Sequence, residues 1–252
     1  GVGHVEAGLR TGALRRPCPE EATRVLIDRV SELLFAPTPR ARRNLMREGA
    51  RPGSVFVTGN TGIDALLWAL RRGRSFREPA LRGLGSGPLA VVTLHRRESL
   101  GPALEGMLRA VRDAARRLPG LLWVFPLHPR PEVRLPARRI LRHPAIRLVP
   151  PLDYLDFVRL MSRARFIVTD SGGIQEEAPS LGKRVVVARD VTERAESVGR
   201  GSVLAGTSYR GLLQAILRCA ASPPLARGRN PYGDGRAAER IASVLRRWQR
   251  IP

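Results

Sequence analysis

Short runs of apolar and β-branched residues alternate along most of the chain with longer segments in which apolar residues recur at helical spacing. The short runs end in turn residues, which predicts strands at 54–60, 89–95, 121–128, 146–151, 165–171, 184–190 and 202–206. The helical spacing predicts helices at 103–117, 153–163, 209–220 and 236–250. Strands that alternate with helices favour an α/β protein whose parallel sheets are covered on both faces.

Polar residues stand where several of these strands end. His95, His128, the pair Asp170 and Ser171, and Asp190 each close a predicted strand. Because ligands of open α/β sheets bind outside the carboxyl ends of the strands, we expect these side chains to face a common crevice. A single strand-end histidine is more often structural than catalytic, whereas several such positions together favour a functional site.

The segment 169–183, "TDSGGIQEEAPSLGK", carries the most specific pattern. Gly172 and Gly173 allow the backbone to approach a ligand closely, and Ser171 can cap the helix that follows. The start of that helix would present free N–H groups to a phosphate. Glu177 lies a turn later, and its carboxylate could accept hydrogen bonds from the two hydroxyls of a ribose. Taken alone, the segment fits an ordinary capped helix with solvated glutamates equally well.

Composition narrows the range of partners. Lys+Arg number 44 against 22 Asp+Glu, a formal charge of +22, but Lys183 is the only lysine and the arginines are spread along the chain. This favours a solvated basic surface over a nucleic-acid site. No apolar run is long enough to cross a bilayer. Cys18 and Cys219 form neither a metal pattern nor a disulfide framework. We expect a cytoplasmic protein without a metal or other cofactor, bound to neither membrane nor nucleic acid.

Seven blocks of sequence resemble the non-hydrolysing UDP-N-acetylglucosamine 2-epimerases, in the order and spacing of that family. They are "HVEAGLRTG" (4–12), "PEEATR" (19–24), "VTGNTGIDAL" (57–66), "TLHRRES" (93–99), "TDSGGIQEEAPSLGK" (169–183), "TER" (192–194) and "NPYGDGRAAERI" (230–241). The resemblance implies two Rossmann-like domains with parallel sheets, as in glycosyltransferase-B folds. It also implies interconversion of UDP-GlcNAc and UDP-N-acetylmannosamine (UDP-ManNAc). In that reaction UDP is eliminated to give 2-acetamidoglucal and is then re-added with C2 inverted.

The resemblance also assigns roles to residues. Glu6, Glu20 and His95 match the catalytic groups, although the sequence leaves open which glutamate is the acid and which the base. Without the resemblance, Glu20 would be read as an acid favoured by the dipole of a helix N-terminus. The positions that match the UDP site are Leu152, Phe157, Ser171, Gly172, Gly173, Glu177 and Arg194. Leu152 would contact the uracil through its backbone.

The resemblance leaves the first domain incomplete, because the opening part of a typical member, with its Gly-Thr-Arg-Pro-Glu turn, has no counterpart here. We expect a first-domain remnant at 1–70, a UDP-binding domain at 71–235 that begins with a linker at 71–88, and a terminal helix at 236–252 that returns to the first domain. Residues 1–252 alone are expected to be inactive. A homodimer is expected for the family.

Other functions fit parts of the pattern. A hydrolysing epimerase that releases N-acetylmannosamine, or a UDP-sugar glycosyltransferase, would have a similar nucleotide half. A UDP-sugar sensor or a basic binding module would need no catalytic groups. The blocks at 4–12 and 93–99 favour epimerisation but do not separate hydrolysing from non-hydrolysing relatives.

Overall fold

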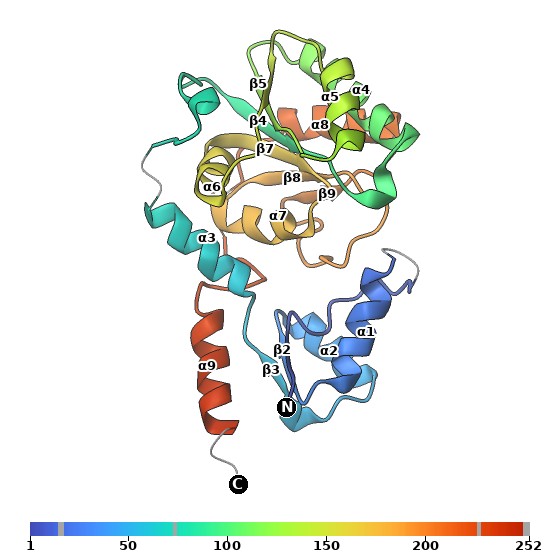
Figure 1. Cartoon of the computed structure of the whole chain (residues 1–252), viewed down its shortest axis with the longest axis vertical. Helices are drawn as coiled ribbons and strands as arrows, with labels where there is room; N and C mark the ends of the chain where they lie inside the picture. Colours follow the sequence, from blue (N-terminus) through green and yellow to red (C-terminus); the bar gives the residue numbers. More distant parts are fainter. Residues whose placement is uncertain (15–17, 73–74, 226–227, 249–252) are drawn as a thin grey trace. The chain divides into compact units, whose positions relative to one another are not determined.

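The computed structural model describes residues 1–14, 18–72, 75–225 and 228–248 (Figure 1). The chain divides into two compact units, which are described separately. Unit 1 comprises Gly1–Trp68, Glu193–Glu196 and Arg229–Pro252, and unit 2 comprises Ala69–Thr192 and Ser197–Gly228. Both units contain parallel sheets with helices packed on them, so the predicted α/β class is confirmed.

Unit 1 is built on a three-stranded parallel sheet in the order β1-β2-β3. Its strands are β1 (Gly3–Val5), β2 (Leu33–Ala36) and β3 (Val55–Val57), and its helices are α1 (Glu20–Val30), α2 (Pro39–Arg47), α3 (Thr61–Arg72, which continues into unit 2) and α9 (Ala237–Trp248). The central strand β2 is buried on both faces. Leu34 packs in the cluster that contains Leu45 of α2, whereas Phe35 packs with Ile241 of α9. This two-sided burial explains why β2 is an unbroken apolar run.

Unit 2 contains a six-stranded parallel sheet in the order β6-β5-β4-β7-β8-β9. The strands are β4 (Leu89–Thr93), β5 (Leu122–Pro126), β6 (Ile146–Val149), β7 (Ala164–Thr169), β8 (Arg184–Val187) and β9 (Ser202–Leu204). The chain begins in the middle of the sheet, builds outward to one edge, and returns to build outward to the other. This is the doubly wound order, and its direction reverses between β4 and β7, where α/β proteins of this kind bind their ligands.

Helices cover both faces of this sheet (Figure 1). On one face, α4 (Pro102–Arg117) packs against α5 (Pro131–Ile140) and α8 (Tyr209–Ala221). Their apolar residues enclose Val92, Trp123 and Val168 of the sheet. The other face carries α6 (Tyr154–Arg163) and α7 (Gly172–Glu177). Short 3-10 turns complete the fold: η1 (Pro52–Ser54), η2 (Pro79–Leu81), η3 (Arg97–Ser99) and η4 (Ala178–Leu181).

Two stretches expected in the UDP-binding domain group with unit 1 instead. Residues 193–196 belong there because Glu193 lies 3.5 Å from Arg24 and Thr38 donates a hydrogen bond to Glu196. Residues 229–235 belong there because the carbonyl of Tyr232 accepts the N–H of Asn60 at 2.7 Å. The grouping of these two stretches therefore differs from the expected UDP-binding range 71–235.

The strands and helices that the sequence predicted lie close to observed elements. The predicted helix at 236–250 is α9, which the structure describes to Trp248. Residues 249–252 lie outside the described residues, as do 73–74 within the expected linker. Within the described parts of the chain, no helix combines the length and the apolar character that a membrane span requires.

Candidate functional site

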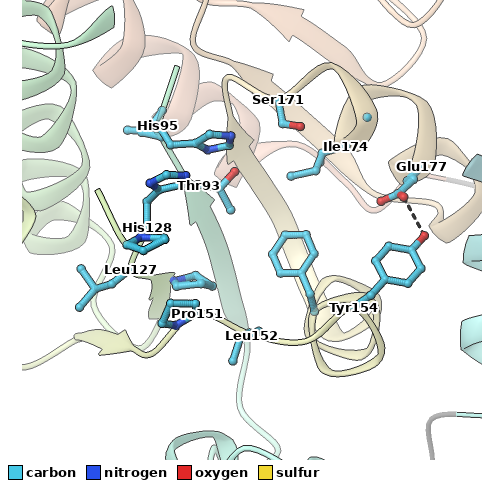
Figure 2. A pocket seen from close by; sticks show the side chains of 15 residues that line it. Thr93, His95, Leu127, His128, Pro151, Leu152, Tyr154, Ser171, Ile174 and Glu177 are labelled. Atoms are coloured by element: carbon cyan, nitrogen blue, oxygen red, sulfur yellow. Dashed lines mark hydrogen bonds between the residues drawn. The ribbon is translucent and has the colours of Figure 1, made fainter. Parts of the chain in front are cut away.

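A cavity of about 370 Å³ opens at the carboxyl ends of β4, β5 and β7, at the point where the sheet order of unit 2 reverses (Figure 2). Its volume suits a small-molecule ligand. The apolar part of its lining includes Leu127, Pro151, Leu152, Phe157 and Ile174. The polar part includes Thr93, His95, His128, Tyr154, Ser171 and Glu177.

Asp170, directly after β7, organises one side of the cavity. Its side chain is fully buried, and its Oδ2 accepts the main-chain N–H groups of His95 at 2.8 Å and Arg96 at 2.9 Å. Its Oδ1 lies 3.6 Å from Nδ1 of His95. Burial raises the pKa of Asp170, against the opposing effect of His95 and the two N–H donors.

The two histidines of the cavity stack on each other. The rings of His95 and His128 have centroids 5.1 Å apart and planes 5° from parallel. Burial lowers the pKa of His128, and the neighbouring His95 and Arg130 lower it further. These surroundings therefore favour the neutral form of His128.

The turn before α7 is fixed by its neighbours. The N–H of Ser171 donates to Oγ1 of Thr169 at 3.0 Å, and the side chain of Gln175 donates to the carbonyl of Ser171 at 3.2 Å. Ser171 occupies the N-cap position, but its hydroxyl caps none of the first-turn N–H groups of the helix, unlike the capping role that the sequence suggested. Ser171 and Gly173 line the cavity, whereas Gly172 is buried in α7.

Tyr154 and Glu177 form a hydrogen-bonded pair at the other side of the cavity from the histidines (Figure 2). The hydroxyl of Tyr154 donates to Oε1 of Glu177 at 2.8 Å. Burial raises the pKa of Glu177 to about 7, although this hydrogen bond opposes the rise. Burial and the adjacent carboxylate also raise the pKa of Tyr154. The pair offers a hydroxyl and a carboxylate beside the apolar wall that includes Leu152 and Phe157.

Glu6 lies in unit 1, immediately after β1. It has a φ of +70°, a left-handed conformation that is unfavourable for a residue other than glycine. Asn60 donates a hydrogen bond to its Oε1, and its Oε2 lies 4.0 Å from Nη2 of Arg194. Strained backbone of this kind occurs frequently at functional sites.

A network of charged residues holds the segment that carries Glu6. Asp28 of α1 accepts hydrogen bonds from Nδ1 of His4 at 2.6 Å, from Nη2 of Arg10 at 2.5 Å and from the N–H of Gly8 at 3.2 Å. Arg10 also pairs with Glu48 of α2 through two hydrogen bonds of 2.8 and 2.9 Å. Burial opposes ionisation of Asp28, but these donors outweigh it and lower its pKa. Both flanks of Glu6 are thereby fixed.

The two acids that begin α1 have different surroundings. Glu20 is exposed, whereas Glu21 is buried and accepts hydrogen bonds from the N–H of Thr11 at 2.7 Å and from Arg24 at 3.0 Å. Both acids stand in the first turn of the helix, where its dipole favours negative charge. The position of Glu20 alone therefore agrees with the structural alternative as well as with a catalytic role.

The structure divides the residues that the sequence singled out between the two units. The cavity of unit 2 is lined by His95, Leu152, Phe157, Ser171, Gly173 and Glu177. Unit 1 holds Glu6, Glu20 and Arg194. Arg194 is nearly buried and pairs with Glu193. Asp190, which we expected at the same crevice, instead accepts the N–H of Thr207 at 3.1 Å.

The sequence assigned no site role to Tyr154, and it treated Asp170 and His128 only as strand-end residues. The strand-end pattern was the signal for the last two. Among the described residues, no cluster of histidine, cysteine and acidic side chains is arranged to hold a metal ion.

A doubly wound parallel sheet with its cavity at the point of reversal places unit 2 in the Rossmann-like class. A family model described as UDP-N-acetylglucosamine 2-epimerase matches residues 1–246. The UDP-N-acetylglucosamine 2-epimerase of Yersinia pestis is 46% identical over an alignment of 263 positions, which covers 98% of this chain and 69% of that protein. The chain belongs to the UDP-N-acetylglucosamine 2-epimerase family, as its sequence blocks predicted.

Solved structures agree. The crystal structure of UDP-GlcNAc 2-epimerase from Neisseria meningitidis bound to UDP-GlcNAc has a TM-score of 0.93 at 39% identity, over 98% of this chain and 70% of that one. The enzyme from Methanocaldococcus jannaschii in complex with UDP-GlcNAc and UDP has a TM-score of 0.85 at 34% identity, over 98% of this chain and 69% of that one. These similarities confirm the predicted fold class, α/β with parallel sheets of the glycosyltransferase-B-like kind.

Proposed function

We propose that this protein interconverts UDP-GlcNAc and UDP-ManNAc without net hydrolysis, by eliminating UDP and adding it back to 2-acetamidoglucal. The observation that carries the proposal is the composition of the unit 2 cavity. An apolar wall, a carboxylate paired with a hydroxyl, and a glycine turn surround one space at the reversal point of the sheet. Relatives that share this fold bind UDP-GlcNAc.

We assign a counterpart at this cavity to each part of UDP. Phe157 would pack against the uracil, and the backbone of Leu152 would contact the edge of the base. The carboxylate of Glu177 would accept hydrogen bonds from the ribose hydroxyls in place of the bond from Tyr154. The diphosphate would lie against Ser171, Gly172 and Gly173, where the first-turn N–H groups of α7 have no partner within the helix.

The sugar chemistry requires groups that move protons. A base must take the proton from C2 as the C1–O bond breaks, and an acid must return a proton to the opposite face of C2 when UDP adds back. We assign these roles to Glu6 and Glu20. His95 lines the same cavity as Ser171, so we assign it to the departing diphosphate, where it would donate a hydrogen bond or a proton to the leaving oxygen. Arg194 would add positive charge to the diphosphate.

Epimerisation in heavy water tests this proposal. The native protein, rather than residues 1–252 alone, should form UDP-ManNAc with deuterium at C2 when it is incubated with UDP-GlcNAc in D₂O, and its His95→Ala variant should form far less. Release of free UDP and N-acetylmannosamine would identify a hydrolysing enzyme instead. Binding of UDP-GlcNAc without exchange at C2 would contradict the proposal and favour a sensor or a glycosyltransferase. The expected homodimer stays a prediction, which sedimentation equilibrium of the native protein would measure.

Glu177→Gln should weaken UDP binding and also stabilise the unliganded protein above pH 7. Burial raises the pKa of Glu177 from 4.5 to about 7, so the folded protein retains this proton at pH values where the unfolded chain has lost it. The carboxylate therefore costs stability, increasingly as the pH rises from about 4.5 to 7 and fully above that. Removing it should raise Tm at pH 8 by about 3–6 °C, from about 1–2 kcal/mol, and change Tm little at pH 4.

The same variant tests the ribose assignment. UDP affinity of the unchanged protein should rise as pH increases through about 7, because the ionised carboxylate is the better acceptor. Glu177→Gln should remove this pH dependence. The matched ligand is 2′,3′-dideoxy-UDP, which lacks the two ribose hydroxyls. The unchanged protein should bind it more weakly than UDP, whereas the Glu177→Gln variant should bind the two ligands with similar affinity. An equal loss for both ligands would mean that Glu177 is structural.

A further inference from the structure

We propose that Asp170 is the positioning residue of His95: its Oδ1 accepts the Nδ1–H of the ring, so that the imidazolium form gives its Nε2 proton to the departing UDP oxygen and the neutral ring takes that proton back when UDP adds again. The proton transfer at Nε2 rests on the proposed function. The contact between Asp170 and Nδ1 of His95 does not, and it can be tested without any turnover.

The geometry places a buried carboxylate beside one nitrogen of the ring. Oδ1 of Asp170 lies 3.6 Å from Nδ1 of His95, which is ion-pair distance and somewhat longer than a hydrogen bond. The carboxylate is fully buried, whereas the imidazole is about a third exposed and lines the cavity. Within the described residues, Oδ1 has no hydrogen-bond partner. An unpaired buried carboxylate oxygen is costly, so a proton on Nδ1 is the partner that the geometry favours.

The fold fixes both members of the pair. In the register of the sheet, Thr93 of β4 lies beside Thr169 of β7, and their hydroxyls hydrogen-bond at 2.8 Å. His95 and Asp170 follow these two threonines, so they leave the sheet at adjacent strand ends. Oδ2 of Asp170 then holds the main chain of His95 and Arg96. One carboxylate thus fixes the backbone with one oxygen and faces the ring with the other.

The other charged groups near His95 do not take over this role. His128 stacks on the ring face and cannot accept a proton from its edge, and burial lowers its pKa. Arg130 is a cation, and it contributes to the lowered pKa of His128. Arg96 is also a cation, and its Nε pairs with Glu98 at 2.6 Å. Asp170 therefore supplies the negative charge that Nδ1 faces.

A nitrogen NMR measurement on the unchanged chain tests the contact directly. Imidazole ¹⁵N shifts distinguish the two neutral tautomers, and the His95→Gln variant assigns the His95 signals among those of the four histidines. At a pH where the ring is neutral, His95 should carry its proton on Nδ1. A dominant Nε2–H tautomer would overturn the proposal, and this measurement requires no variant at Asp170 to fold.

Asp170→Asn tests the consequence in the native protein. The amide keeps an oxygen for the two main-chain N–H groups but can turn an NH₂ donor toward Nδ1, which favours the wrong tautomer. We expect kcat to fall by about 30-fold or more, while KM and UDP affinity change by less than about threefold. The tautomer of His95 should switch to Nε2–H. Asp190→Asn, the same change at the end of β8, should leave all these quantities near their original values.

A double-mutant cycle separates positioning from general support of the fold. If Asp170 acts through His95, Asp170→Asn should cost less than about threefold in kcat once His95→Ala is present. The full loss on that background, or an equal loss of UDP affinity, would show that Asp170 is only structural. If His95→Ala alone turned over normally, the proposed role of His95 would be wrong, and the NMR result would still decide whether Asp170 orients the ring.

Discussion

Glu6→Gln should lower the turnover of the native protein by about a hundredfold or more and leave its UDP affinity unchanged. Glutamine has nearly the same shape, and its side-chain oxygen can still accept the hydrogen bond from Asn60. What the variant loses is the ability to take or give a proton. The measurement is kcat for epimerisation beside the dissociation constant for UDP.

The strained backbone at Glu6 makes this a sharp test. A φ of +70° is retained for a glutamate only where the surroundings enforce it, and here Asp28 fixes His4 on one flank and Gly8 and Arg10 on the other. The matched control is Glu239→Gln, since Glu239 forms an exposed ion pair with Arg236 that contributes little. If the Glu6→Gln variant epimerised normally, the catalytic assignment of Glu6 would be wrong and its role would be structural.

Gly173→Val should abolish measurable UDP binding and leave the fold intact. A Cβ built at Gly173 would meet only Oγ of Ser171, at 4.0 Å, so the protein itself has room for a side chain there. Gly173 nevertheless lines the cavity, and the added atoms would occupy the space from which a diphosphate approaches the backbone. We expect a loss of about a hundredfold or more in affinity, since both the N–H contacts and the phosphate position are blocked.

Gly173 gives a cleaner test than its neighbour. Gly172 is buried, so a larger residue there would also disturb the packing of α7. Gly87→Val is the control, because Gly87 lies in the same unit and a Cβ there would meet no atom within 4 Å. Isothermal titration with UDP gives the affinities, and thermal unfolding shows that both variants fold. If Gly173→Val bound UDP with unchanged affinity, the assignment of the diphosphate to this turn would be wrong.

The strands of unit 2 could be predicted because each is a short β-branched or apolar run that ends in turn residues. β1 and β2 could not. Gly3–Val5 is too short to show alternation, and Leu33–Ala36 is an apolar run that fits a buried helix as well as a strand. The helix α5 was also missed, because Pro136 lies inside it and proline usually marks a helix end.

The candidate site was predictable where local chemistry defines it. The glycine turn and Glu177 share one short segment, and strand-end polar residues pointed to the crevice that His95 and His128 line. Local sequence patterns could not predict contacts between residues that lie far apart in the chain. The contact of His95 with Asp170 depends on β4 and β7 being neighbours, which follows from the sheet order. Residues 193–196 join unit 1 through Arg24 and Thr38, partners that no local pattern indicates.

The charge network around Asp28 restricts how sequences of this family can drift. His4 and Arg10 bind the same buried carboxylate, and Arg10 is shared with Glu48. Replacing Arg10 would leave the buried carboxylate of Asp28 without its cation, and breaking a buried ion pair in this way destabilises a protein by about 3–5 kcal/mol, whereas exchanging the whole set for apolar residues can be nearly neutral. A change at these positions must therefore either pass through a sequence variant that folds poorly or alter two of the positions at the same time. The four residues should be inherited as a block, because together they hold the backbone that carries Glu6.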